Sequence, residues 1–157
     1  MKNSHQRGFT LIELIVTVVV LAIFASIAVP SYSEWIERER LSRAVSDMNN
    51  LIQFARTETL KTDTNMYVVY TVGDGWCSAV QTSSAALNCA STITDRHVTY
   101  TNYSNIEMVS PAASSYFYFD KVRGVPVGSS DFTFENSLSD ECSLSVSMLG
   151  MVTIDGC

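Results

Sequence analysis

A single carboxylate interrupts a long apolar run near the start of the sequence. From Phe9 to Val29 there are 21 residues, and Glu13 is the only strongly polar one among them. A carboxylate inside a membrane-spanning segment costs roughly 3 kcal/mol on insertion scales. A carboxylate such as that of Glu13 therefore needs a cationic partner when it is removed from water.

Four cysteines, Cys77, Cys89, Cys142 and Cys157, all follow this apolar run. An even number of cysteines in an exported domain is typical of two disulfides. Of the three possible connectivities we favour Cys77–Cys89 and Cys142–Cys157, because each closes a short loop and stabilises by roughly 3 kcal/mol. Zinc binding is the alternative. The sequence has no C-x-x-C pair and His97 is the only histidine of the exported part, so we expect no metal.

No familiar catalytic motif accompanies these residues. The sequence lacks H-E-x-x-H, G-x-S-x-G and a glycine-rich phosphate loop. His97 has no evident partner and is expected to be a surface or hydrogen-bonded residue rather than a base. The acids between Asp131 and Glu141 lack the spacing of calcium ligands and predict a solvated loop. We therefore expect neither an enzyme nor a cofactor.

The charge distribution predicts an exported protein with an acidic body. Residues 1–8 carry two basic side chains and no acid, which holds the N-terminus in the cytoplasm while the part after the apolar run is translocated. Without these residues the basic count falls from 10 to 8 against 16 acids, a side-chain charge of −8. General affinity for nucleic acid or anionic lipid is therefore not expected.

The apolar run continues into a longer helix. As a helix, Phe9–Val29 extends about 31 Å, enough to cross a hydrocarbon core. After Pro30, which we expect to kink the helix without ending it, apolar residues recur at steps of three and four until a polar stop at 62–65. This predicts an amphipathic helix over 30–62. Its apolar face comprises Leu41, Ala44, Val45, Met48, Leu51, Ile52, Ala55 and Leu60.

Residues 63–157 predict a β-rich head of antiparallel strands, and hence an α+β fold. β-Branched and aromatic runs separated by turn residues predict strands at Met66–Val72, Val98–Tyr103, Tyr116–Phe119, Phe132–Phe134 and Cys142–Leu149. Gly150 predicts a terminal hairpin over Leu144–Ile154. The Ser- and Ala-rich segment Trp76–Ala90 is interpreted as a stapled loop or short hairpin rather than a core strand.

Three interpretations compete for the N-terminal segment. A secretory signal peptide, cut after a small residue such as Ala28, is the first. A plain membrane anchor is the second, and in it Glu13 gains only ~0.3–1 kcal/mol from the helix macrodipole. Neither interpretation explains a carboxylate in lipid, because the macrodipole term is smaller than the cost of burying the charge. The helix pattern also continues past the supposed cleavage site at Ala28.

The third interpretation rests on Arg7-Gly8-Phe9-Thr10-Leu11-Ile12-Glu13-Leu14, which resembles the processing site of the type IV pilin family. The resemblance implies that a prepilin peptidase removes residues 1–8 by cleavage between Gly8 and Phe9, and that the new amine of Phe9 is methylated. It also implies that residues 9–29 form a membrane and later filament-core helix. The family's glutamate guides subunit docking, so the resemblance assigns assembly to Glu13. A bond to the amine of its own Phe9 is the open alternative.

Two further segments resemble one branch of this family. Residues 54–61 (FARTETLK) and 119–126 (FDKVRGVP), the latter followed by Phe132–Phe134, are similar to the minor pilins of the FimT/FimU group and to the secretion pseudopilin GspH. The C-terminal cysteine pair is similar to the disulfide-bounded loop of type IV pilins, which favours a minor pilin over a pseudopilin of a type II secretion system. A membrane-anchored periplasmic enzyme or binding protein is the alternative of another class.

The resemblance also implies partners and a location. These are other minor and major pilins, the prepilin peptidase and the inner-membrane assembly machinery, with a periplasmic head that later joins a surface filament. Some members of the group bind DNA through basic residues near the C-terminus. Here no Lys or Arg follows Arg123, so direct nucleic-acid binding is not expected.

Overall fold

The computed structural model describes residues 9–89, 96–113, 115–128 and 131–157. The chain forms two compact units, Met1–Trp35 and Ile36–Cys157. Helix α1, Leu11–Thr62, supplies residues to both units.

The helix continues through Pro30 without a break, which confirms that this proline does not end it. Proline removes one backbone donor, and good helix formers on both sides maintain the remaining hydrogen bonds. The Ser33 hydroxyl donates to the Pro30 carbonyl oxygen at 2.8 Å. Asp63, directly after the last helical residue, has a left-handed φ of 50°, so the chain turns out of the helix at the predicted polar stop. A kink near Pro30 stays a prediction.

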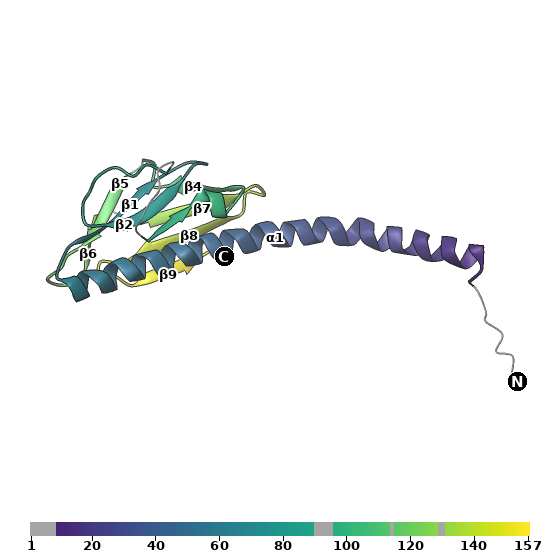
Figure 1. Cartoon of the computed structure of the whole chain (residues 1–157), viewed down its shortest axis with the longest axis horizontal. Helices are drawn as coiled ribbons and strands as arrows, with labels where there is room; N and C mark the ends of the chain where they lie inside the picture. Colours follow the sequence, from purple (N-terminus) through teal and green to yellow (C-terminus); the bar gives the residue numbers. More distant parts are fainter. Residues whose placement is uncertain (1–8, 90–95, 114, 129–130) are drawn as a thin grey trace, which may run out of the picture. The chain divides into compact units, whose positions relative to one another are not determined.

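Two antiparallel sheets form the rest of the second unit (Figure 1). The five-stranded sheet has the order β3-β2-β1-β5-β6 and the four-stranded sheet the order β4-β7-β8-β9. The strands are β1 (Met66–Thr71), β2 (Cys77–Gln81), β3 (His97–Thr99), β4 (Ile106–Ser110), β5 (Ser115–Phe119), β6 (Pro126–Val127), β7 (Asp131–Asn136), β8 (Glu141–Val146) and β9 (Val152–Asp155), with a 3-10 turn at Tyr100–Asn102.

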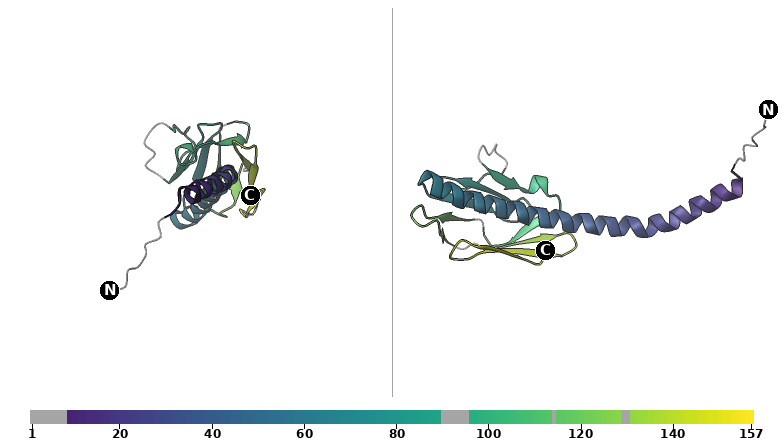
Figure 2. Two further views of the ribbon diagram at one scale, coloured as in Figure 1. Left: turned by 90° about the vertical axis from the view of Figure 1, so that its right-hand side faces the viewer. Right: turned by 90° about the horizontal axis from the view of Figure 1, so that it is seen from below.

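In the second unit, the part of α1 that follows Ile36 lies along the sheets (Figure 2). One hydrophobic core contains buried side chains from this part of the helix and from both sheets. The predicted apolar face of the helix is buried from Leu41 to Ala55. Leu60 is the exception: it is 57% exposed, and Thr59 is buried instead. The Thr59 hydroxyl donates to the Ala55 carbonyl oxygen at 2.8 Å, so its burial leaves no polar atom unpaired.

The predicted strands differ from the observed ones in four places. The segment Val98–Tyr103 divides into the short strand β3 and the 3-10 turn, and strands β4 and β6 were not predicted. The interpretation of Trp76–Ala90 was wrong in part, because β2 is an internal strand between β1 and β3. Four of its five residues are buried. Burial on both faces removes the alternation that marks a strand in a sequence.

Candidate functional site

The first half of α1 presents an uncovered apolar surface. None of the residues from 9 to 35 is buried, and large apolar side chains such as Leu11, Leu21 and Phe24 are 65–76% exposed. By length and composition alone, α1 is apolar enough to cross a membrane. A soluble protein would lose about 25 cal/mol for each Å² of apolar area left in water. This half of the helix is therefore suited to lipid or to other helices.

Glu13 lies in the first turn of the helix, and Thr10 caps that turn. The Glu13 backbone N–H donates to the Thr10 hydroxyl at 3.3 Å, and the Leu14 N–H donates to the Thr10 carbonyl oxygen at 3.3 Å. Thr10-Leu11-Ile12-Glu13 has the T-x-x-E spacing of a capping box, a signal that our sequence reasoning missed. Only the threonine half of the box is formed. Within the described residues no ion pair involves Glu13.

The structure describes only one of the two residues of the predicted cleavage site. Phe9 is 84% exposed and precedes the first helical residue by two positions. Gly8 lies outside the described residues. Cleavage between Gly8 and Phe9 and methylation of Phe9 stay predictions.

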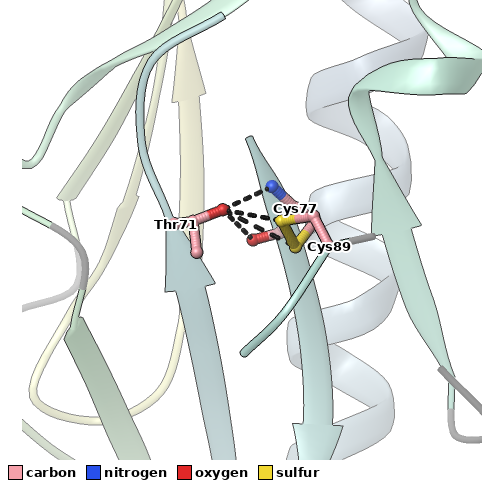
Figure 3. The surroundings of a disulfide bond; sticks show 3 residues. All are labelled: Thr71, Cys77 and Cys89. Atoms are coloured by element: carbon pink, nitrogen blue, oxygen red, sulfur yellow. Dashed lines mark hydrogen bonds between the residues drawn. A yellow bond between two sulfur atoms is a disulfide. The ribbon is translucent and has the colours of Figure 1, made fainter. Parts of the chain in front are cut away.

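The disulfide between Cys77 and Cys89 holds the chain after β2 against the sheet (Figure 3). The two Cα atoms are 5.8 Å apart. Thr71 lies opposite Cys77 in strand β1, and its hydroxyl is hydrogen-bonded at this disulfide. That hydroxyl accepts the Cys77 backbone N–H at 2.9 Å and lies 3.0 Å from the Cys89 sulfur. The role of Thr71 was not predicted, because only the register between β1 and β2 brings it there.

A second disulfide, Cys142–Cys157, closes the C-terminal hairpin with its Cα atoms 5.2 Å apart. Gly156 has a φ of +86°, and a Cβ there would lie 2.7 Å from the Glu141 carbonyl oxygen. The chain therefore needs glycine beside this disulfide. Both disulfides join the pairs favoured from sequence.

Polar side chains fasten the hairpins of the head to the helix. Arg56 donates to the Gly150 carbonyl oxygen at 3.0 Å and to that of Leu149 at 3.2 Å. Arg38 pairs with Asp140 at 3.1 Å. Hydrogen bonds from Asn136 and then from Arg38 lower the pKa of the Asp140 carboxyl. These contacts hold the β7–β8 and β8–β9 turns at fixed positions along α1.

The described residues of the head show no arrangement typical of catalysis. His97 is exposed on β3. Among the described residues, no three His, Cys, Asp or Glu side chains are placed to hold a metal ion.

A long apolar N-terminal helix that continues into a β-rich head is the architecture of pilin-like proteins. The prokaryotic N-terminal methylation motif matches residues 3–29. The family described as type II transport protein GspH matches residues 44–150, and the chain belongs to this family.

Part of the chain is similar to known fimbrial proteins. Residues of the chain are 41% identical over 56 positions to a fimbrial protein of Pseudomonas aeruginosa, which covers 36% of each chain. They are 44% identical over 49 positions to the type IV major fimbrial protein FimA of Dichelobacter nodosus, which covers 31% of each. The chain thus aligns with about a third of the length of these relatives.

Solved structures share the fold over most of the chain. Two crystal forms of the type IV minor pilin FimU of Pseudomonas aeruginosa are similar, with TM-scores of 0.52 and 0.56 at 16% and 17% identity. They cover 73% and 77% of this chain and 92% of FimU. The expected pilin-like α+β fold is therefore confirmed.

Proposed function

We propose that this chain is a minor pilin of a type IV pilus, held in the inner membrane with a periplasmic head and then incorporated at the initiating or tip end of the filament. The observation that carries the proposal is the exposed apolar half of α1 with the Glu13 carboxylate in its first turn. In lipid that carboxylate is costly, and in a bundle of helices it can pair with a cation. A helix with this residue is thus suited to leave the bilayer for a filament.

The cation that we propose is the amine of Phe9 on a neighbouring subunit. Cleavage after Gly8 creates this amine, which lies about 6 Å along the helix from Glu13 of the same chain. An axial stagger between bundled helices places the amine of one subunit beside Glu13 of the next. The pairing then favours one docking depth over others, because any other depth leaves two charges unpaired out of water.

The first experiment tests processing. Mass spectrometry of the N-terminus in sheared pili should find Phe9 as the first residue, carrying one methyl group. An intact leader or a cut after Ala28 would overturn the proposal.

The second experiment tests docking. Glu13→Gln removes the charge and keeps the shape, so the variant should be processed normally but recovered at least about tenfold less in sheared pili. Glu34→Gln is the matched control, because Glu34 is also an exposed acid of the first unit. It should be recovered like the unchanged protein, and equal recovery of the Glu13 variant would contradict the proposed role.

A pseudopilin of a type II secretion system is the second candidate, favoured by the description of the matching family. Deletion of the gene separates the two: loss of surface pili with normal secretion of exoproteins supports the pilus, and the opposite result supports the secretion system. Direct DNA binding is not proposed, since the sequence after Arg123 carries acids and no base.

A further inference from the structure

Two aromatic side chains stand directly after the apolar run, on one face of α1. Tyr32 and Trp35 are three residues apart and stack with ring centroids 5.9 Å apart and an interplanar angle of 28°. Both are largely exposed, at 62% and 57%. Large rings with this much exposed apolar area favour an environment other than water, because exposed apolar area in water is unfavourable.

Their position along the helix identifies that environment. If Phe9 lies at one edge of a hydrocarbon core about 30 Å thick, the opposite edge falls close to Val29. The Cα atom of Tyr32 then lies ~4.5 Å beyond that edge and that of Trp35 ~9 Å beyond it. The headgroup layer is roughly 5–7 Å thick on each side. Side chains of a helix lean toward its N-terminus, so the Trp35 indole returns toward this layer.

The neighbouring residues favour the same depth. Acids and bases begin at Glu34 and continue through Arg40, and the first buried core residue is Leu41. The aromatic pair therefore lies between an apolar segment that fits hydrocarbon and a charged segment that fits water. Tyrosine and tryptophan favour that boundary because each has an apolar ring and a polar N–H or O–H.

We propose that Tyr32 and Trp35 form an interfacial anchor, which lies in the lipid headgroup layer on the side of the head and sets the depth of α1 before assembly. The inference rests on the proposed membrane insertion. The anchor would oppose sliding of the helix in either direction, since one direction moves the polar ring atoms into hydrocarbon and the other moves the rings into water. The depth of Glu13 in the bilayer follows from that position.

Tryptophan fluorescence tests the location. The chain has two tryptophans, and Trp76 is fully buried in the head, so quenching by lipid reports on Trp35. The full chain is reconstituted in vesicles of phosphatidylethanolamine and phosphatidylglycerol that carry bromine either near the headgroups or near the acyl-chain ends. Trp35 should be quenched about twofold more by the shallow bromines than by the deep ones. Trp35→Phe should abolish the quenching.

A second probe separates this inference from membrane insertion itself. Phe24→Trp in the Trp35→Phe background places the fluorophore within the apolar run, where deep bromines should quench it more. If this probe is quenched but Trp35 is not, or if Trp35 is quenched most by deep bromines, the anchor is wrong and insertion stands. If Phe24→Trp is unquenched as well, insertion itself fails and the anchor with it.

Depth setting requires a third measurement. Replacing both Tyr32 and Trp35 with leucine extends the apolar stretch toward Ile36 and moves its centre ~5 Å along the helix. A Phe24→Trp probe in that variant should shift toward stronger quenching by deep bromines. The matched control is the same probe with Tyr32→Phe and Trp35→Phe, which retains both rings and should shift less. Identical profiles for the leucine variant and its parent would overturn the depth-setting role.

Discussion

The indole N–H of Trp76 donates a 2.9 Å hydrogen bond to the carbonyl oxygen of Ile106. Trp76 precedes β2 of the five-stranded sheet, and Ile106 begins β4 of the four-stranded sheet. The same indole contacts Phe134 of β7 edge to face at a centroid distance of 5.1 Å. One buried side chain thus joins the two sheets by a polar and an apolar contact.

Trp76→Phe should lower the free energy of unfolding by about 2–4 kcal/mol, because it leaves a cavity and an unpaired carbonyl oxygen in the core. Urea unfolding of the full chain in detergent, followed by circular dichroism, measures the loss. Trp35→Phe is the control, since that side chain is 57% exposed and the change in free energy should stay within about 0.5 kcal/mol. Equal effects of the two substitutions would show that Trp76 is not the joint between the sheets.

Tyr103 makes the head sensitive to alkaline pH. Its hydroxyl donates a hydrogen bond to the Asp47 carboxylate. Burial of the phenol, and then this carboxylate, raise the pKa of Tyr103 above its usual 10.0. Above pH 10 the unfolded chain loses a proton that the folded chain keeps, so the free energy of unfolding should fall as pH rises from there.

Tyr103→Phe should remove that alkaline dependence. At neutral pH it should cost about 1 kcal/mol, since Asp47 reaches solvent and the bond is only partly buried. Urea midpoints measured from pH 8 to pH 11 test this, with Tyr32→Phe as the control for an exposed tyrosine. A Tyr103→Phe profile as steep as that of the unchanged protein would contradict the assignment.

Gly156→Ala should destabilise the C-terminal hairpin. The positive φ costs an L-residue about 1–2 kcal/mol, and the added Cβ meets the Glu141 carbonyl oxygen. Gly75→Ala is the matched control, because nothing lies within 4 Å of its Cβ position and its φ is not in the left-handed region. Thermal unfolding should show a lower Tm for the first variant only.

Thr71→Val should weaken the packing of the backbone around the Cys77–Cys89 disulfide while leaving the disulfide itself intact. The substitution preserves the shape of the side chain but removes the acceptor of the Cys77 N–H, which costs about 1–3 kcal/mol for a buried donor. Hydrogen exchange at Cys77 should become faster. Thr153→Val, at an exposed hydroxyl of β9, is the control and should leave that exchange rate unchanged.

The first third of this protein could be predicted from its sequence. The apolar run of membrane length, its single acid, the basic residues before it and the periodic face from Leu41 to Ala55 are all local patterns. Local patterns predict a helix and its environment. The pairing of the cysteines is also predictable from local sequence, because closing a loop of 12 or 15 residues has a small entropic cost.

Only the tertiary structure decided the arrangement of the head. Strand β2 has no alternating pattern because both of its faces are covered, and the bonds of Thr71, Trp76 and Tyr103 join residues 6, 30 and 56 positions apart. Sheet order and register set those distances, and they depend on which strands pair rather than on any stretch of neighbouring residues. Thr59 replaces Leu60 in the core for the same reason: the position of the sheets decides which side of the last helical turn is covered.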